Sequence, residues 1–90
     1  MIVLLHHTAD KYLERLNTTD RERINTALEK LGHEPPEGDI RPYEGRVGVL
    51  RLRVGSYRAI FKVVNDSILV THIEPRGQAY TKKTKSKRGK

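Results

Sequence analysis

Three arginines lie on two short segments of alternating polarity in the middle of the chain. Arg51 and Arg53 alternate with apolar residues, and Arg58 follows a Gly55-Ser56 pair. Apolar alternation on both sides of a Gly-Ser pair predicts a β-hairpin. A tight turn at that pair places Arg53 opposite Arg58, so all three guanidinium groups lie on one face of a sheet.

Like charges placed opposite each other on neighbouring strands destabilise a sheet by about 0.2–1 kcal/mol per pair. A guanidinium group is permanently cationic, and its planar fork binds phosphate oxygens in pairs. The cluster therefore indicates recognition of an anion. The alternative is a solvated basic face, partly neutralised by Glu44 or Glu74.

The net charge of +7 is unevenly distributed along the 90 residues. Residues 1–39 hold five Lys/Arg against eight Asp/Glu, whereas residues 40–90 hold thirteen against three. Residues 81–90 contribute six basic residues and no acidic one. This asymmetry points to a polyanionic partner for the C-terminal half.

Composition excludes several classes of site. The chain has no cysteine, which rules out disulfides and thiolate chemistry. The adjacent His6 and His7 point to opposite faces of a strand, which is unsuitable for a metal site. The apolar run at residues 1–5 is too short for a signal peptide or a membrane span. We expect one soluble, cytoplasmic domain without metal or cofactor.

The expected elements form an α+β domain. Residues 2–6 read as a strand buried on both faces, followed by a helix that Thr8 caps and that ends near Leu16. Thr19 and Glu22 have capping-box spacing for a second helix, which ends near Leu31. Strands follow at residues 39–43, 49–54, 57–64 and 68–74. We expect two N-terminal helices packed on one face of a small antiparallel sheet, in the order β-α-α-β-β-β(-β).

Two blocks of sequence resemble the RelE/ParE superfamily of toxins from type II toxin–antitoxin systems. They are Asp-Ile-Arg-Pro-Tyr-Glu-Gly at residues 39–45 and Leu-Arg-Leu-Arg-Val-Gly-Ser-Tyr-Arg-Ala-Ile-Phe at residues 50–61. A further signature is an arginine followed four residues later by a tyrosine, here Arg76 and Tyr80. The resemblance covers residues 1–80 as a toxin domain and leaves residues 81–90 as a basic tail that we expect to be disordered.

The resemblance implies a cognate antitoxin that binds the toxin in a hetero-oligomer, and one of two activities. RelE-like members cleave mRNA in the ribosomal A site, using the substrate's 2′-hydroxyl as nucleophile. ParE-like members inhibit DNA gyrase without nuclease chemistry. A third alternative is a member that has kept the fold and lost toxicity. In the RelE-like reading, the mRNA and the ribosomal RNA are partners.

That reading assigns roles to individual residues. The catalytic positions would be held by Arg51, Arg58, Arg76 and Tyr80. Further basic residues would bind the RNA, namely Arg46, Arg53, Lys62, Lys82 and Lys83. We expect the tail to act as an electrostatic tether to ribosomal RNA.

The residue that would accept the proton is left open. The prototype ribonuclease carries two lysines in the first strand of the hairpin, and the matching positions here hold Val49 and Arg51. Arginine is a poor general base because its pKa lies above about 12. The remaining candidates are Glu44, Glu74 and His72, and a half-buried structural role is the alternative for His72.

Overall fold

A computed structural model describes residues 1–75 of the chain. It contains two helices and five strands in the order expected from the sequence. The elements are β1 (Ile2–Leu5), α1 (His7–Glu14), α2 (Thr18–Leu31), β2 (Asp39–Pro42), β3 (Leu50–Val54), β4 (Tyr57–Val64) and β5 (Ser67–Pro75).

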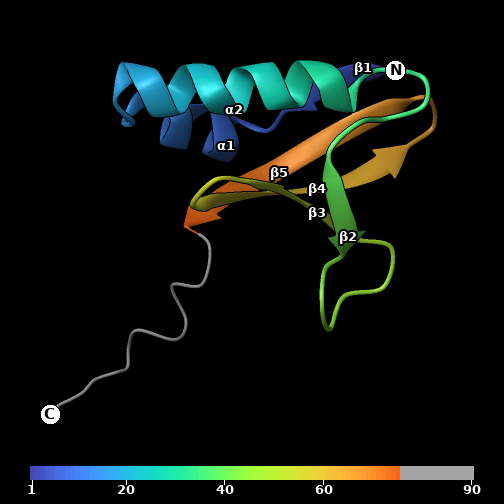
Figure 1. The fold of residues 1–90 in the computed structure, drawn as a ribbon. Coiled ribbons are helices and arrows are strands. Elements are labelled where there is room, and N and C mark those ends of the chain that lie inside the picture. The colour runs from blue at the N-terminus through green and yellow to red at the C-terminus, as the bar shows by residue number, and fades with distance from the viewer. Residues whose placement is uncertain (76–90) are drawn as a thin grey trace, which may run out of the picture.

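The strands form one sheet in the order β1-β5-β4-β3-β2, and both helices lie on the same side of it (Figure 1). The pairs β2–β3, β3–β4 and β4–β5 are antiparallel. Strand β1 pairs in parallel with β5, with Ile2 opposite Ser67. The expected α+β fold is confirmed, and the parallel pair at one edge makes the sheet mixed.

The hydrophobic core lies between the helices and the sheet. Its largest fully buried side chains come from α2 and the central strands, including Ile24, Leu31, Leu52, Ile68 and Val70. These residues recur at helical spacing in α2 and on alternate positions of the strands, so each element presents one apolar side to the same layer. No helix within residues 1–75 covers the opposite face of the sheet, which carries the arginines.

Strand β1 is an edge strand, which corrects the expectation that it is buried on both faces. Ile2 and Leu4 are 64% and 50% exposed. Only Val3 and Leu5 face the helices and pack against the core. Ile2 and Leu4 point to the other face, which neither helix covers, and an apolar run does not reveal how many faces of its sheet are covered.

Both helices start earlier than expected. The side chain of His6, not that of Thr8, caps α1 by accepting a hydrogen bond from the Thr8 amide. Asn17 caps α2, since its Oδ1 accepts from the Asp20 amide at 2.8 Å. Asparagine is at least as good a cap as threonine, so Asn17 caps the helix in place of Thr19 and α2 begins at Thr18.

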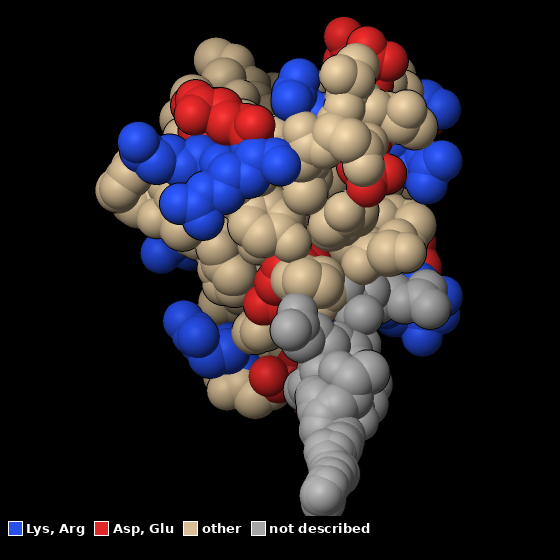
Figure 2. Space-filling model, turned by 90° about the vertical axis from the view of Figure 1, so that its left-hand side faces the viewer, with Lys and Arg blue, Asp and Glu red and all other residues tan. Residues whose placement is uncertain are grey.

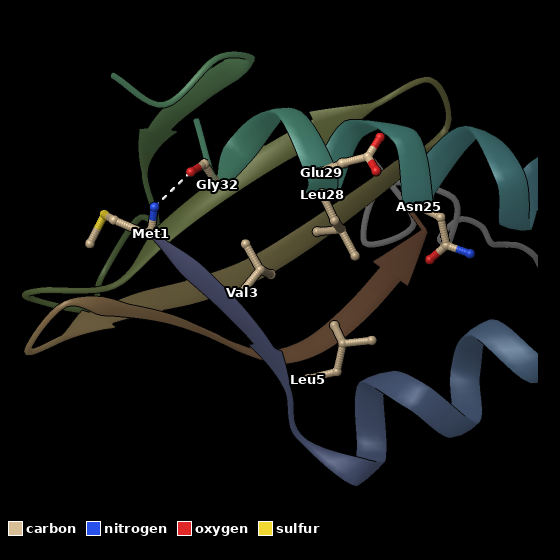
Figure 3. Close-up of a pocket in the computed structure, with 7 residues that line it drawn as sticks. All are labelled: Met1, Val3, Leu5, Asn25, Leu28, Glu29 and Gly32. Carbon is tan, nitrogen blue, oxygen red and sulfur yellow. Dashed lines mark hydrogen bonds between the residues drawn. The ribbon is translucent and has the colours of Figure 1, made fainter. Parts of the chain in front are cut away.

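A hollow of about 340 Å³ lies between β1 and α2 (Figure 3). Val3 and Leu5 of the strand and Leu28 of the helix project toward it. At one end, the amino group of Met1 donates a hydrogen bond of 2.7 Å to the carbonyl oxygen of Gly32. No helix among residues 1–75 is long and apolar enough to cross a membrane.

Candidate functional site

The central hairpin has the expected register, and it places the arginines on the face without helices. Val54 lies opposite Tyr57, and Arg53 lies opposite Arg58. The turn residue Gly55 has a φ of 56°, which glycine adopts without strain. We call Arg51, Arg53 and Arg58 the arginine face.

Two rows of paired residues cross the sheet on this face. The first row reads Asp39, Arg53, Arg58, Glu74 from β2 to β5. The second row reads Arg41, Arg51, Ile60, His72. The first row has a carboxylate at each end and is neutral as a whole, whereas the second row carries two arginines and no carboxylate.

Arg58 is the most constrained of the three arginines. Its guanidinium forms an ion pair with Glu74, and only 28% of its side chain is exposed. The guanidinium carbon lies 5.7 Å from the centre of the Tyr43 ring, a cation–π distance. Its Nε is buried and has no hydrogen-bond partner among residues 1–75. Buried donors are nearly always paired, so this buried N–H is an exception among residues 1–75.

Glu74 also contacts His72. One carboxylate oxygen pairs with Arg58, and the other lies 3.3 Å from Nε2 of His72. The other ring nitrogen of His72 is 3.3 Å from Oγ1 of Thr71, and the ring meets that of Tyr43 edge-on. The partial neutralisation by Glu74 is confirmed, and the same contacts place a titratable imidazole beside Arg58.

The charge of Glu74 also affects the pKa of a tyrosine in α1. Burial, and then the negative charge of Glu74, raise the pKa of Tyr12 above its ordinary value. Tyr12 meets Tyr57 edge-on with ring centres 6.3 Å apart.

Arg51 is held by β2. Its side chain is 14% exposed and donates from Nη1 to the carbonyl oxygen of Asp39 at 3.3 Å, with a carboxylate oxygen of Asp39 at 3.7 Å. Arg41 lies 3.6 Å from the same carboxylate. Asp39 thus brings the guanidinium groups of Arg41 and Arg51, on neighbouring strands, close to one carboxylate oxygen.

The remaining expected site residues divide into two groups. Arg46 and Lys62 lie further along the same face, where both line a second hollow. The others fall outside the described residues, namely Arg76, Tyr80, Lys82 and Lys83. Among residues 1–75 there is no cluster of His, Asp and Glu that could hold a metal ion.

Sequence reasoning missed Asp39, Arg41 and Tyr43 as parts of this surface. Their register against β3 depends on the intervening loop at residues 43–49, which no tight-turn rule fixes. The signal was the alternation of Asp39 and Arg41 about Ile40, which matches the alternation about Leu52 in β3.

Basic side chains do not form a continuous patch at one end of the molecule. Figure 2 shows the end of the molecule that lies on the left of Figure 1, where Lys and Arg stand in separate groups beside Asp and Glu. On this end of the molecule, the positive charge is therefore interrupted by carboxylates.

Comparison with known proteins identifies the relatives of this chain. Residues 3–80 match the family model described as "ParE toxin of type II toxin-antitoxin system, parDE". None of the curated proteins matches the sequence significantly.

Solved structures share the fold. The archaeal RelE–RelB complex from Pyrococcus horikoshii OT3 aligns with a TM-score of 0.71 and 29% identity, covering 87% of this chain and 97% of that chain. The RelB–RelE complex from Methanococcus jannaschii aligns with a TM-score of 0.67 and 25% identity, covering 80% and 88%. The isolated E. coli RelE toxin aligns with a TM-score of 0.70 over 88% and 87% of the two chains, at 16% identity.

Proposed function

We propose that this chain, which belongs to the ParE toxin family of type II toxin–antitoxin systems, acts as a ribosome-dependent endoribonuclease that cleaves mRNA. One observation carries the proposal: Arg51, Arg53 and Arg58 lie together on the sheet face that neither α1 nor α2 covers. Such a donor set fits a phosphate group.

The proposed reaction needs no nucleophile from the protein. The 2′-oxygen of the RNA attacks the adjacent phosphorus, the bond from phosphorus to the 5′-oxygen breaks, and a cyclic 2′,3′-phosphate remains. The 2′-hydroxyl loses a proton, and the leaving 5′-oxygen gains one. The guanidinium groups of Arg51 and Arg58 would stabilise the negative charge on the pentacoordinate phosphorus.

Among the described residues, His72 is the candidate for a proton transfer. It lies in the row next to Arg58, and its Nε2 contacts Glu74. Imidazole titrates near neutral pH, which suits it to accept or donate a proton, whereas arginine does neither. Arg76 and Tyr80 keep their proposed catalytic roles from the sequence signature. The ribosome as target also places the proposed activity in the cytoplasm.

The second candidate function is inhibition of DNA gyrase. The pairing of Arg58 with Glu74 favours it, since a neutralised guanidinium binds phosphate less strongly. In that case the arginine face would contact a protein rather than RNA. The family model that matches the chain is also the one described for ParE.

We also propose a cognate antitoxin as partner in a hetero-oligomer. The two archaeal relatives were solved as complexes of RelE with RelB. Two surfaces of this chain suit such a partner: the arginine face, which an acidic segment would neutralise, and the exposed β1 edge with Ile2 and Leu4.

A test separates the two candidate activities. The chain is induced alone, and incorporation of labelled amino acids and supercoiling of a plasmid are followed in the same culture. Early loss of translation, with mRNA fragments that end in a cyclic phosphate, supports the ribonuclease. Loss of supercoiling before translation supports gyrase inhibition and refutes the first proposal.

A matched pair of variants tests the role of Arg58. Arg58→Ala should abolish growth arrest while the protein stays folded, because the side chain leaves the sheet on the face opposite the core. Arg58→Lys should restore it only partly, since the planar fork is lost. Arg23→Ala removes an exposed arginine of α2 and should leave toxicity unchanged. Full toxicity of soluble Arg58→Ala would remove this residue from the mechanism.

A further inference from the structure

Arg58 lies between a like charge and an opposite charge on its own face of the sheet. Arg53 lies opposite it on β3, and Glu74 lies opposite it on β5. Like charges in opposite positions repel, whereas the carboxylate of Glu74 forms an ion pair with the guanidinium. A phosphate that binds Arg58 must take the place of this carboxylate. During that exchange, the ion pair no longer fixes the arginine.

A β-bulge in β5 brings Glu74 to this face of the sheet. Thr71 is an extra residue in the pairing with β4, between Val70 and His72. Val70 and Ile73 both pack in the core although they are three positions apart, whereas a regular strand alternates its faces at every residue. The bulge therefore turns His72 and Glu74 to the side that carries the arginine face.

Tyr43 is a second support for Arg58, and it carries no charge. The guanidinium carbon of Arg58 lies 5.7 Å from the centre of the Tyr43 ring. A cation is attracted to the face of an aromatic ring within about 6 Å of its centre. Unlike the carboxylate of Glu74, the ring does not neutralise the guanidinium. It can therefore hold Arg58 without competing with a phosphate for the positive charge.

Tyr43 is itself fixed at the base of the loop at residues 43–49. Its amide donates to the carbonyl oxygen of Val49 at 2.8 Å, and its carbonyl oxygen accepts from the Arg46 amide at 3.2 Å. The side chain is half-buried, and its ring meets the imidazole of His72 edge-on with the ring centres 6.5 Å apart. Glu74 makes none of these contacts, so they remain when its carboxylate is displaced.

We propose that Tyr43 is a positioning residue, whose ring keeps the guanidinium of Arg58 in place when a phosphate displaces Glu74. The inference rests on the proposed phosphate site at Arg58 and adds a residue to it. Glu74 neutralises Arg58 in the free protein, and Tyr43 holds it both before and after the exchange. An arginine that is already in place spares the bound RNA the cost of ordering a long side chain, which is a factor of about two to ten in affinity.

The first test follows the Arg58 side chain in the free full-length protein, by NMR relaxation of its Nε. This nitrogen is buried, so water has little access to its proton. Glu74→Ala removes the charged support, and the Nε should stay rigid because Tyr43 still holds the guanidinium. Adding Tyr43→Leu should make the Nε mobile on the picosecond-to-nanosecond timescale. Adding Tyr43→Phe instead, which restores the ring, should restore the rigidity.

The second test measures the affinity of the same variants for a labelled hexauridylate by fluorescence anisotropy. In the Glu74→Ala background, Tyr43→Leu should weaken binding about fivefold, and Tyr43→Phe should restore it. Because Tyr43 acts through Arg58, Tyr43→Leu should add nothing to the weaker binding of Arg58→Ala. Neither substitution removes the backbone hydrogen bonds of Tyr43, and urea unfolding of each variant verifies that the fold is kept.

Three results overturn the positioning role and leave the ribonuclease proposal standing. They are a mobile Nε in Glu74→Ala with Tyr43 intact, equal weakening of RNA binding by Tyr43→Phe and Tyr43→Leu, and an effect of Tyr43→Leu that is as large without Arg58 as with it. RNA affinity that Arg58→Ala leaves unchanged is a different result, because it refutes the phosphate site itself and this inference with it.

Discussion

Glu74 forms an ion pair with Arg58, the arginine that we assign to the phosphate. Replacing Glu74 with glutamine should therefore strengthen binding of RNA. In the free protein, the Glu74 carboxylate pairs with Arg58. A phosphate that takes its place must first break that pair. Glu74→Gln keeps the shape and the contact with His72, and it removes the competing charge.

The magnitude follows from the burial of the pair. The side chains of Arg58 and Glu74 are 28% and 24% exposed. Fully exposed ion pairs contribute about 0.2–1 kcal/mol, and hydrogen bonds to charged groups contribute about 1.5–3 kcal/mol. A pair about a quarter exposed lies between the two ranges, at about 1 kcal/mol. The variant should bind RNA about fivefold more tightly, and its free energy of unfolding should fall by a similar amount.

Fluorescence anisotropy with a labelled hexauridylate measures the first change, and urea unfolding measures the second. Glu44→Gln is the matched control, because it removes the same charge from an exposed loop residue on the way to β3. In the Arg58→Ala background, Glu74→Gln should add nothing. If Glu74→Gln weakens binding relative to Glu44→Gln, then Glu74 positions Arg58 for the ligand, and the reasoning from competition is wrong.

Three further predictions concern the scaffold. Asn17→Ala should lower the free energy of unfolding by about 1 kcal/mol in urea unfolding, because the Asp20 amide loses its cap; an unchanged midpoint would show that another group caps α2. Tyr57→Phe should lower the midpoint of urea unfolding, since the phenol donates to Asp20 at 2.8 Å. That hydrogen bond raises the pKa of Tyr57 above its ordinary value, so its contribution is complete below about pH 10 and is lost as the pH rises through the raised pKa; the loss should be absent in Tyr57→Phe. Gly32→Ala should cost about 1–3 kcal/mol, because an added Cβ would lie 2.8 Å from the carbonyl oxygen of Met1, and a neutral result would show that β1 can shift.

The sequence sufficed to predict the hairpin and its arginines. A Gly-Ser pair between alternating segments leaves one register open to the chain, so Arg53 could be placed opposite Arg58 from spacing alone. The turn at residues 65–66 could also be predicted from the sequence, and Asn65 has a positive φ of 57° there.

Contacts between segments far apart in the sequence could not be predicted from the sequence. That Glu74 meets Arg58, and that Tyr43 lies over it, depends on which strands are neighbours and on the bulge beside Ile60. A bulge changes the face of the sheet to which every later residue of the strand points. No local sequence pattern around Thr71 indicates a bulge. The exposure of Ile2 and Leu4 depends likewise on which face of the sheet the helices cover, which is a property of the whole fold.

The parallel pairing of β1 with β5 has a consequence for the synthesis of this protein. Among the described strands, β1 has its only sheet neighbour in β5, Ser67–Pro75, which follows it by more than sixty residues. Until that segment emerges, β1 has no partner, α1 lacks the strand on which it packs, and the core stays open. The same segment brings His72 and Glu74 to the arginine face. The fold of residues 1–75 and the sheet face that carries the arginines are therefore completed together, once β5 has been synthesised.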